Sequence, residues 1–365
     1  MTLRLAVTGT HLEGFSGLPR NLVTALREEC DVRAWPLPTY QPPVAKRGLM
    51  RARRFLGRDY LWEKDPARCQ FLSRAIDQRA SEESVDAILV IGSESCAFCT
   101  TSVPLFGFGD SIFGSRLDLY ADQVSSRISA RSMAEGIAVQ QRALDRMRVY
   151  FITSQWAWDR AVARLRYATD AARVDVVLAG ANLPHVAVAP PTPADRSPCL
   201  IWVGVDWVRK RGDLAVAAVA AMRDSGVDAR LDVVGPVTVP SPPHFVTAHG
   251  RLDAASGLGD VYARSSALLL PTAADLTPVV IAEAAMYGRA TFASPAGGIP
   301  EMIRDGVDGV LVDSDDPRVW AAALRGSLSG DALMTMGRAA RASYEQRLNW
   351  RVIARRIIAR IESVS

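Results

Sequence analysis

The sequence predicts an α/β protein built from two Rossmann-like domains, and three observations support this fold class. Short apolar runs bounded by Gly or Pro alternate with helical stretches along the chain, which is typical of consecutive βα units. The 365 residues are too many for one ordinary hydrophobic core and suit two α/β domains. Five prolines fall between Pro184 and Pro198 and indicate an interdomain linker.

The linker divides the chain into four predicted parts. These are a first domain at residues 1–183, the linker at 184–198, a second domain at 199–345 and a final segment at 346–365. In the final segment a helix is predicted from Trp350 to about Ile361, with three isoleucines on one face. A helix with one apolar face needs a surface to pack on.

The first domain opens with a strand at residues 3–7, a glycine-containing loop and a helix from about residue 18 to 28. Gly9, Gly14 and Gly17 do not have the GxGxxG spacing of a dinucleotide site, which argues against an NAD-dependent enzyme. Such a loop still lets a ligand approach the backbone, although it can equally be a plain turn. His11 in this loop is either an acceptor contact or an ordinary loop residue.

Further strands of the first domain are predicted at 32–35, 85–91, 103–108, 148–154 and 174–178, and helices at 130–147 and from Gln155. Asp110 follows the fourth strand. Its carboxylate either binds sugar hydroxyls or caps the following turn.

A basic segment lies at residues 46–58, with six Lys or Arg, no acid, and Leu49, Met50, Phe55 and Leu56 interleaved. One interpretation is an amphipathic helix that contacts a membrane surface or a phospholipid-linked acceptor. The other is a solvated helix face.

The second domain begins with a strand at 199–203, and the loop after it carries Arg209, Lys210 and Arg211 just before a helix. Three cations at the carboxyl end of a strand are placed to hold a phosphate, unless they form a solvated basic turn. A second strand is predicted at 230–234, followed by a turn at 249–252.

The stretch from 268 to 311 organises this domain. A strand at 267–270 ends at Pro271, Asp275 lies in the following turn, and a helix is predicted with Thr277 as N-cap and Pro278 as first residue. The helix ends near Gly288, and a strand at 290–293 and a helix from about Ile299 follow. Glu283 is the single charge in this apolar helix, so the buried carboxylate needs a partner.

Strand, loop and helix N-terminus together form the place where open α/β sheets bind ligands. The helix start favours an anion such as a phosphate. Asp275 and Glu283 add two carboxylates that accept hydroxyl groups. This combination suits a sugar nucleotide.

The same stretch resembles the signature of the family 4 glycosyltransferases of the GT-B fold. The matching residues are Asp275 and Glu283 eight apart, Ala284, Gly288 and the run Gly297-Gly298-Ile299-Pro300-Glu301; Ser154, Trp156 and Asn182 match elsewhere. The chain departs from the family in four places, one of which is that no His precedes Asp110. Asp275 replaces the usual Glu, Leu276-Thr277 replaces Phe-Gly, and Arg211 replaces the Gly after Lys210.

The resemblance implies a retaining, metal-independent transfer of a sugar from a nucleotide-diphosphate sugar to a glycan, lipid-linked or small-molecule hydroxyl, with no cofactor. It implies two domains that face a cleft and a final helix that crosses back to the first domain. Lys210 would hold the diphosphate, Asp275 the donor sugar, Glu283 the ribose, and Asp110 a sugar or acceptor hydroxyl. The other expected donor-binding residues are Gly14, Ser16, Gly17, Gly204, Arg209, Arg211, Gly250, Arg251, Leu276, Thr277, Pro278 and Val279.

Composition argues against several other classes of function and location. The net charge of +4 is too small to favour nucleic acid, and there is no apolar run of 18 residues. The N-terminus enters a strand directly, so no signal peptide is expected, and five scattered cysteines indicate a reducing, cytoplasmic compartment. Cys96 and Cys99 are expected to be free thiols and no metal site is expected.

Two alternatives remain open. One is a different enzyme on the same fold. A sugar-nucleotide epimerase would turn over the donor with no acceptor, and a phosphorylase would need phosphate or a covalently held pyridoxal. The other is a non-catalytic subunit that binds a nucleotide and transfers nothing.

Overall fold

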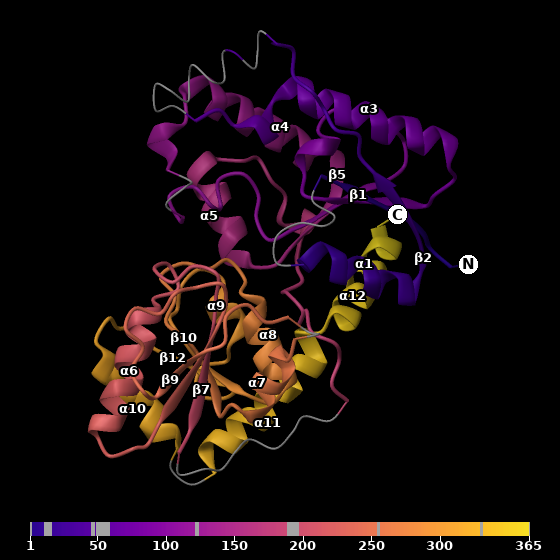
Figure 1. Cartoon of the computed structure of the whole chain (residues 1–365). Coiled ribbons are helices and arrows are strands. Elements are labelled where there is room, and N and C mark those ends of the chain that lie inside the picture. The colour runs from indigo at the N-terminus through magenta and orange to yellow at the C-terminus, as the bar shows by residue number, and fades with distance from the viewer. Residues whose placement is uncertain are drawn as a thin grey trace. The chain divides into compact units, whose positions relative to one another are not determined.

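The computed structural model describes residues 2–10, 17–44, 48, 59–120, 124–187, 197–253, 256–328 and 331–364. The chain forms two compact units (Figure 1). Unit 1 comprises Met1–Val177 and Ile353–Ser365, and unit 2 comprises Leu178–Val352. Each unit contains a six-stranded sheet whose strand pairs are all parallel, which confirms the predicted α/β class.

The sheet of unit 1 has the strand order β2-β1-β3-β4-β5-β6. Its strands are β1 (Arg4–Gly9), β2 (Asp31–Pro36), β3 (Ala87–Ile91), β4 (Leu105–Gly109), β5 (Met147–Ile152) and β6 (Val174–Val176). Its helices include α1 (Leu18–Glu29), α3 (Pro66–Glu82), α4 (Ala130–Arg146) and α5 (Gln155–Leu165). Every residue of β3 is buried, as expected for a strand covered on both faces.

The sheet of unit 2 has the order β12-β11-β10-β7-β8-β9. Its strands are β7 (Cys199–Val203), β8 (Arg230–Val234), β9 (Val246–Ala248), β10 (Ala267–Leu270), β11 (Ala290–Ala293) and β12 (Gly309–Leu311). Its helices are α6 (Gly212–Asp224), α7 (Leu258–Arg264), α8 (Val279–Met286), α9 (Ile299–Met302), α10 (Pro317–Leu328) and α11 (Ala332–Arg347). Helices α7, α8 and α11 pack on one face and α6 and α10 on the other. The strand order reverses between β7 and β10, which makes the carboxyl ends of these two strands the topological switch point.

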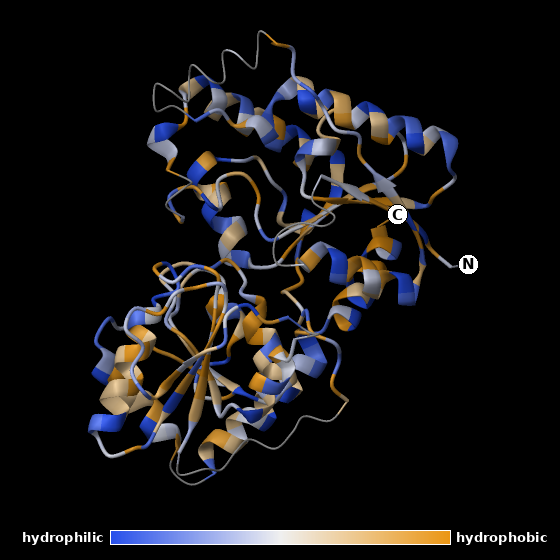
Figure 2. Cartoon of the chain, viewed as in Figure 1, coloured by the Kyte–Doolittle hydropathy of each residue, from blue (hydrophilic) through white to orange (hydrophobic). Residues whose placement is uncertain are grey.

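The hydropathy of the strands explains where each core sits. Figure 2 shows apolar residues concentrated in the strands of both sheets, whereas the helices carry hydrophilic residues as well. No helix in the described part of the chain combines the length and apolarity needed to span a membrane.

The last helix, α12 (Trp350–Val364), belongs to unit 1 from Ile353 onward. Within unit 1, Arg355 Nε lies 3.0 Å from Glu29 Oε1, and Arg356 pairs with Asp175. The predicted return of the final helix to the first domain is therefore confirmed.

The first crossing between the units comes earlier than predicted and the second comes later. Leu178 and Leu183 pack against the core of unit 2, and the Ala181 amide donates to the Leu348 carbonyl at 3.2 Å. The crossings lie at 177/178 and 352/353 rather than at 183 and 345. Residues 184–187, which were predicted to be linker, belong to unit 2, and Val186 among them packs partly buried against its core. Residues 188–196 lie outside the described range.

Candidate functional site

Two loops meet at the switch point of unit 2. Arg209 and Lys210 follow β7, and Asp275 follows β10. Lys210 Nζ lies 3.3 Å from Asp275 Oδ2, and Arg209 Nη1 lies 3.3 Å from Asp275 Oδ1. The fold thus brings two cations to one carboxylate from a loop far along the chain. The Arg209 side chain also reaches Ala274, which is 65 residues away in sequence.

Lys210 is fixed from both ends. The Trp202 indole N–H donates to the Lys210 carbonyl at 3.2 Å, and only 9% of the Lys210 side chain is exposed. A Cβ on Gly204 would lie 2.6 Å from Lys210 Cδ. Gly204, predicted as a donor contact, therefore makes room for the lysine stem.

The two neighbouring arginines diverge. Arg209 Nη1 donates to the Ala274 carbonyl at 2.6 Å and its Nε lies 3.4 Å from Asp206 Oδ2. Arg211 instead pairs with Asp315 and lines a pocket of about 430 Å³ beside the carboxyl ends of β10, β11 and β12. The structure thus brings Arg209 to Asp275 and directs Arg211 to Asp315.

Asp275 is held by a close approach of two loops. Gly297 has φ +61°, and a Cβ there would lie 1.8 Å from the Asp275 carbonyl oxygen, so glycine is required. The Gly298 amide donates to the Leu276 carbonyl at 2.9 Å. Asp275 Oδ2 is buried, and among the described residues no donor makes a hydrogen bond to it, although the Lys210 charge is close.

Helix α8 begins one residue later than predicted. Pro278 is the N-cap, with ψ 112°, and its carbonyl accepts the Ile281 amide at 3.1 Å. The prediction that Thr277 is the N-cap is therefore wrong, because the extended ψ of Pro278 delays the first helical turn. Val279 and Val280 start the helix, where amides have no intrahelical acceptor.

Glu283 lies on α8 with only 5% of its surface exposed. Burial raises the pKa of its carboxyl to about 7, against the hydrogen bond from Tyr262, the amide of Asn182 and the charge of Lys210. The Tyr262 hydroxyl donates to Glu283 Oε2 at 3.1 Å. The partner required by a buried carboxylate is thus a neutral hydroxyl, and the carboxyl is balanced between its two charge states near neutral pH.

The remaining predicted residues are spread over both units. Gly250 and Arg251 are exposed after β9, and the Gly250 carbonyl accepts the Gly235 amide at 2.8 Å. In unit 1, Asp110 is exposed and accepts from Ser111 Oγ at 2.8 Å, and Gly17 is the N-cap of α1 with φ 72°. His11, Gly14, Ser16 and, except for Gly48, residues 46–58 lie outside the described residues.

Unit 1 contains a buried ion pair that the sequence did not indicate. Lys64 Nζ lies 3.1 Å from Glu94 Oε2, just after β3. Gln140 Oε1 accepts from Ser93 Oγ and from the Phe113 amide, each at 3.0 Å, beside this pair. An acid directly after a buried strand was the available signal for Glu94, whereas Lys64 has no local signal.

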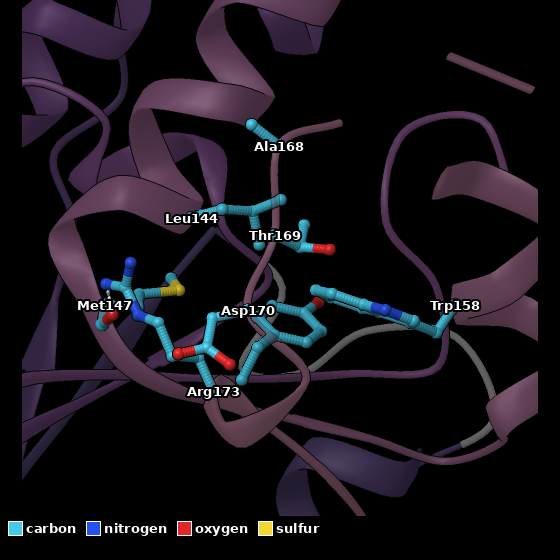
Figure 3. Close-up of a pocket in the computed structure, with 8 residues that line it drawn as sticks. Leu144, Met147, Trp158, Ala168, Thr169, Asp170 and Arg173 are labelled. Carbon is cyan, nitrogen blue, oxygen red and sulfur yellow. Dashed lines mark hydrogen bonds between the residues drawn. The ribbon is translucent and has the colours of Figure 1, made fainter. Parts of the chain in front are cut away.

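Two further features of unit 1 do not make a site. Cys96 and Cys99 are free and buried, and among the described residues no group of three or more His, Cys, Asp or Glu is placed to hold a metal ion. Figure 3 shows a small cavity whose lining includes Leu144, Met147 and Trp158. Its volume of about 20 Å³ admits roughly one water molecule and no sugar.

A doubly wound sheet with cations, carboxylates and a helix start at its switch point is characteristic of nucleotide-binding α/β domains. Residues 197–329 match the family "Glycosyl transferases group 1". The matched residues all lie within unit 2.

Curated relatives include the D-inositol 3-phosphate glycosyltransferases of Mycolicibacterium vanbaalenii and Segniliparus rotundus. The first is 29% identical over 202 residues, which cover 47% of this chain and 44% of the relative. The second is 29% identical over 219 residues, which cover 53% and 47%. The chain thus spans less than half the length of these relatives.

Solved structures resemble the whole chain. Sucrose-phosphate synthase from Thermosynechococcus elongatus has a TM-score of 0.67 at 15% identity, over 99% of this chain and 98% of that one. Anabaena HepE in complex with UDP and glucose has a TM-score of 0.63 at 14% identity, over 100% of both. These likenesses show the fold and confirm the predicted GT-B architecture.

Proposed function

We propose that the protein transfers a sugar from a nucleotide-diphosphate sugar to an acceptor hydroxyl, with retention of configuration and without a metal ion or cofactor. The observation that carries the proposal is the cluster of Arg209, Lys210 and Asp275 at the switch point of unit 2, with Glu283 on the adjoining helix. The family match, and the complexes of Anabaena HepE with UDP and UDP-glucose, support a nucleotide-sugar donor.

The cations act on the leaving diphosphate. A cation about 4 Å from a phosphate charge contributes roughly 4 kcal/mol at an effective dielectric constant near 20. If that contribution arises mainly in the transition state, it is worth about a thousandfold in rate. Lys210, Arg209 and the start of α8 supply this stabilisation from the protein itself.

The two carboxylates bind hydroxyl groups. Asp275 Oδ2 is buried without a hydrogen-bond donor among the described residues, so a donor-sugar hydroxyl would satisfy it. Glu283 would accept from the ribose. The Asp275 side chain is one methylene shorter than that of Glu. The close approach of Gly297 to the Asp275 carbonyl fixes the backbone from which this short side chain extends.

The acceptor is proposed to be a glycan, lipid-linked or small-molecule hydroxyl bound by unit 1, where exposed Asp110 is a candidate contact. Because the curated relatives are D-inositol 3-phosphate glycosyltransferases, D-inositol 3-phosphate is the first small acceptor to test. A cytoplasmic location, with membrane contact through residues 46–58, is part of the same proposal.

The test is a transfer assay with UDP-, GDP- and ADP-sugars on the wild type, Lys210→Ala, Asp275→Asn and Arg211→Ala. We expect Lys210→Ala to lose about a thousandfold in kcat/KM for the cationic contribution derived above, and Asp275→Asn to lose activity strongly. Arg211→Ala should lose less than about tenfold, because its guanidinium pairs with Asp315.

Three readouts decide the proposal. Circular dichroism controls that each variant is folded, nuclear magnetic resonance of the product reports anomeric configuration, and EDTA should leave the rate unchanged. Wild-type turnover in both Lys210→Ala and Asp275→Asn would show that these two residues do not form the donor site.

A further inference from the structure

Tyr262 touches Glu283 from a neighbouring helix. It lies on α7, is fully buried, and its hydroxyl donates to Glu283 Oε2 at 3.1 Å. Its ring stacks on Tyr287 with centroids 5.7 Å apart and an interplanar angle of 15°. Arg289 Nε donates to the Tyr262 carbonyl at 3.0 Å. Both ends of the tyrosine are therefore fixed, and its hydroxyl has one direction to point.

A backbone amide meets the same carboxyl group. The amide of Asn182 is hydrogen-bonded to Glu283 and helps to lower its pKa. The Asn182 side chain is itself held, because Trp350 Nε1 donates to Asn182 Oδ1 at 3.0 Å. The preceding Ala181 amide is tied to the Leu348 carbonyl. Glu283 thus has two rigid donors inside unit 2.

We infer that Tyr262 is a positioning residue for donor binding: with the Asn182 amide it fixes the Glu283 carboxylate in the orientation that accepts hydroxyls of the donor's ribose. The inference rests on the proposed function. An ionised carboxylate offers about four acceptor directions, and two inner donors leave the others for a ligand. A pair of adjacent ribose hydroxyls matches this remaining capacity.

The charge of Glu283 depends on the same contacts. The groups that face it are Tyr262 from α7, Tyr287 at the C-cap of α8, the Asn182 amide from the segment before β7, and Lys210 from the β7–α6 loop. Asp260 on α7 acts on Tyr287. Burial raises the pKa of Glu283 to about 7, and the Tyr262 hydrogen bond is the strongest influence that lowers it. Removing that hydroxyl raises the pKa further, so less carboxylate is present at neutral pH.

The experiment compares Tyr262→Phe with Tyr287→Phe. The second variant is the matched control, because it removes a tyrosine hydroxyl from the neighbouring stacked ring. The dissociation constant of UDP, GDP or ADP, whichever the wild type binds, is measured by calorimetry from pH 6 to 9. For Tyr262→Phe we expect about tenfold weaker binding at pH 7, the value for one lost hydrogen bond to a charged group. Binding should recover only in part at pH 9, because Glu283 ionises there while the orienting hydrogen bond stays absent, and kcat at saturating donor should stay within about twofold.

Tyr287→Phe should stay within about twofold of the wild type at every pH, because no carboxylate partner is lost. Equal binding by the two variants would overturn the positioning role, and so would a loss in Tyr262→Phe that disappears completely at pH 9. If the wild type binds no nucleoside diphosphate at all, the proposed function fails first and this role fails with it.

Discussion

Glu94 in unit 1 and Glu283 in unit 2 occupy comparable places but differ in charge. Glu94 follows β3, Glu283 lies on the helix after β10, and both belong to parallel, doubly wound sheets. They are 6% and 5% exposed. Burial on its own would raise both pKa values, yet that of Glu94 falls to about 2 while that of Glu283 rises to about 7.

The partner makes the difference. Burial is the largest single influence on the pKa of Glu94 and raises it, but the Lys64 charge 3.1 Å away, the hydrogen bonds to the carboxylate and the Arg68 charge together outweigh burial. The hydrogen-bonding partners of Glu283 are a neutral hydroxyl and a backbone amide, which do not offset the loss of water. Glu94 is satisfied within its own unit, whereas Glu283 keeps capacity for a ligand. A buried acid with neutral partners is therefore the better indicator of a binding site.

The largest effect is expected from Lys64→Met, which leaves the Glu94 charge buried without its cation. We predict a loss of about 3–5 kcal/mol in the free energy of unfolding at pH 7, measured by urea denaturation. In the wild type, the folded pKa of Glu94 is depressed, so its contribution is present above the unfolded pKa of 4.5 and is lost as pH falls to about 2.

The matched control is the double variant Lys64→Met/Glu94→Gln, which removes both charges and should regain most of that loss. If the single variant unfolds at the same urea concentration as the wild type, Glu94 is not held by Lys64 and the comparison fails on its unit 1 side.

Glu283→Gln should act in the opposite direction. The folded pKa of Glu283 is raised, so its favourable contribution is present below the unfolded pKa of 4.5 and is lost as pH rises through about 7. The difference between an unfolded pKa of 4.5 and a folded pKa of about 7 corresponds to roughly 3 kcal/mol at pH 8. Glutamine keeps an acceptor for Tyr262 and carries no charge.

We therefore expect Glu283→Gln to be more stable than the wild type at pH 8 and equal to it at pH 4, in urea denaturation series at both values. Glu94→Gln serves as the control, because it should lower stability at pH 8. A Glu283→Gln variant that is less stable than the wild type at pH 8 would show that this carboxyl is not strained by burial.

The contrast also shows what the sequence can reveal. Four strands of unit 2 match their predicted bounds, because buried parallel strands are continuous apolar runs: Cys199–Val203, Arg230–Val234, Ala267–Leu270 and Ala290–Ala293. Glu283 was predicted to need a partner because it is the one charge in an apolar helix. That its partners are Tyr262 and Asn182 has no local signal, since the fold brings them together over 21 and 101 residues.

Other features depend on tertiary structure in the same way. The Lys64–Glu94 pair spans 30 residues and was not predicted. The prolines placed the domain boundary at 183, but Leu178 and Leu183 pack, partly buried, against the core of unit 2. Thr277 was favoured as an N-cap by its hydroxyl, and the extended backbone of Pro278 moved the cap by one residue.

The smallest effect concerns ligand linkage. A nucleoside diphosphate at 100 times its dissociation constant should stabilise the state that binds it by about 2.7 kcal/mol. If only unit 2 holds the donor, native-state hydrogen exchange should slow in the amides of β10 and α8 by this amount and stay unchanged in β3 beside Glu94.

Because ribose hydroxyls are accepted by the ionised form of Glu283, the protection should be larger at pH 8 than at pH 6, compared at equal total nucleotide. Equal slowing in β3 would mean that the two glutamates do not report on separate units, and protection that is the same at both pH values would separate donor binding from the charge of Glu283.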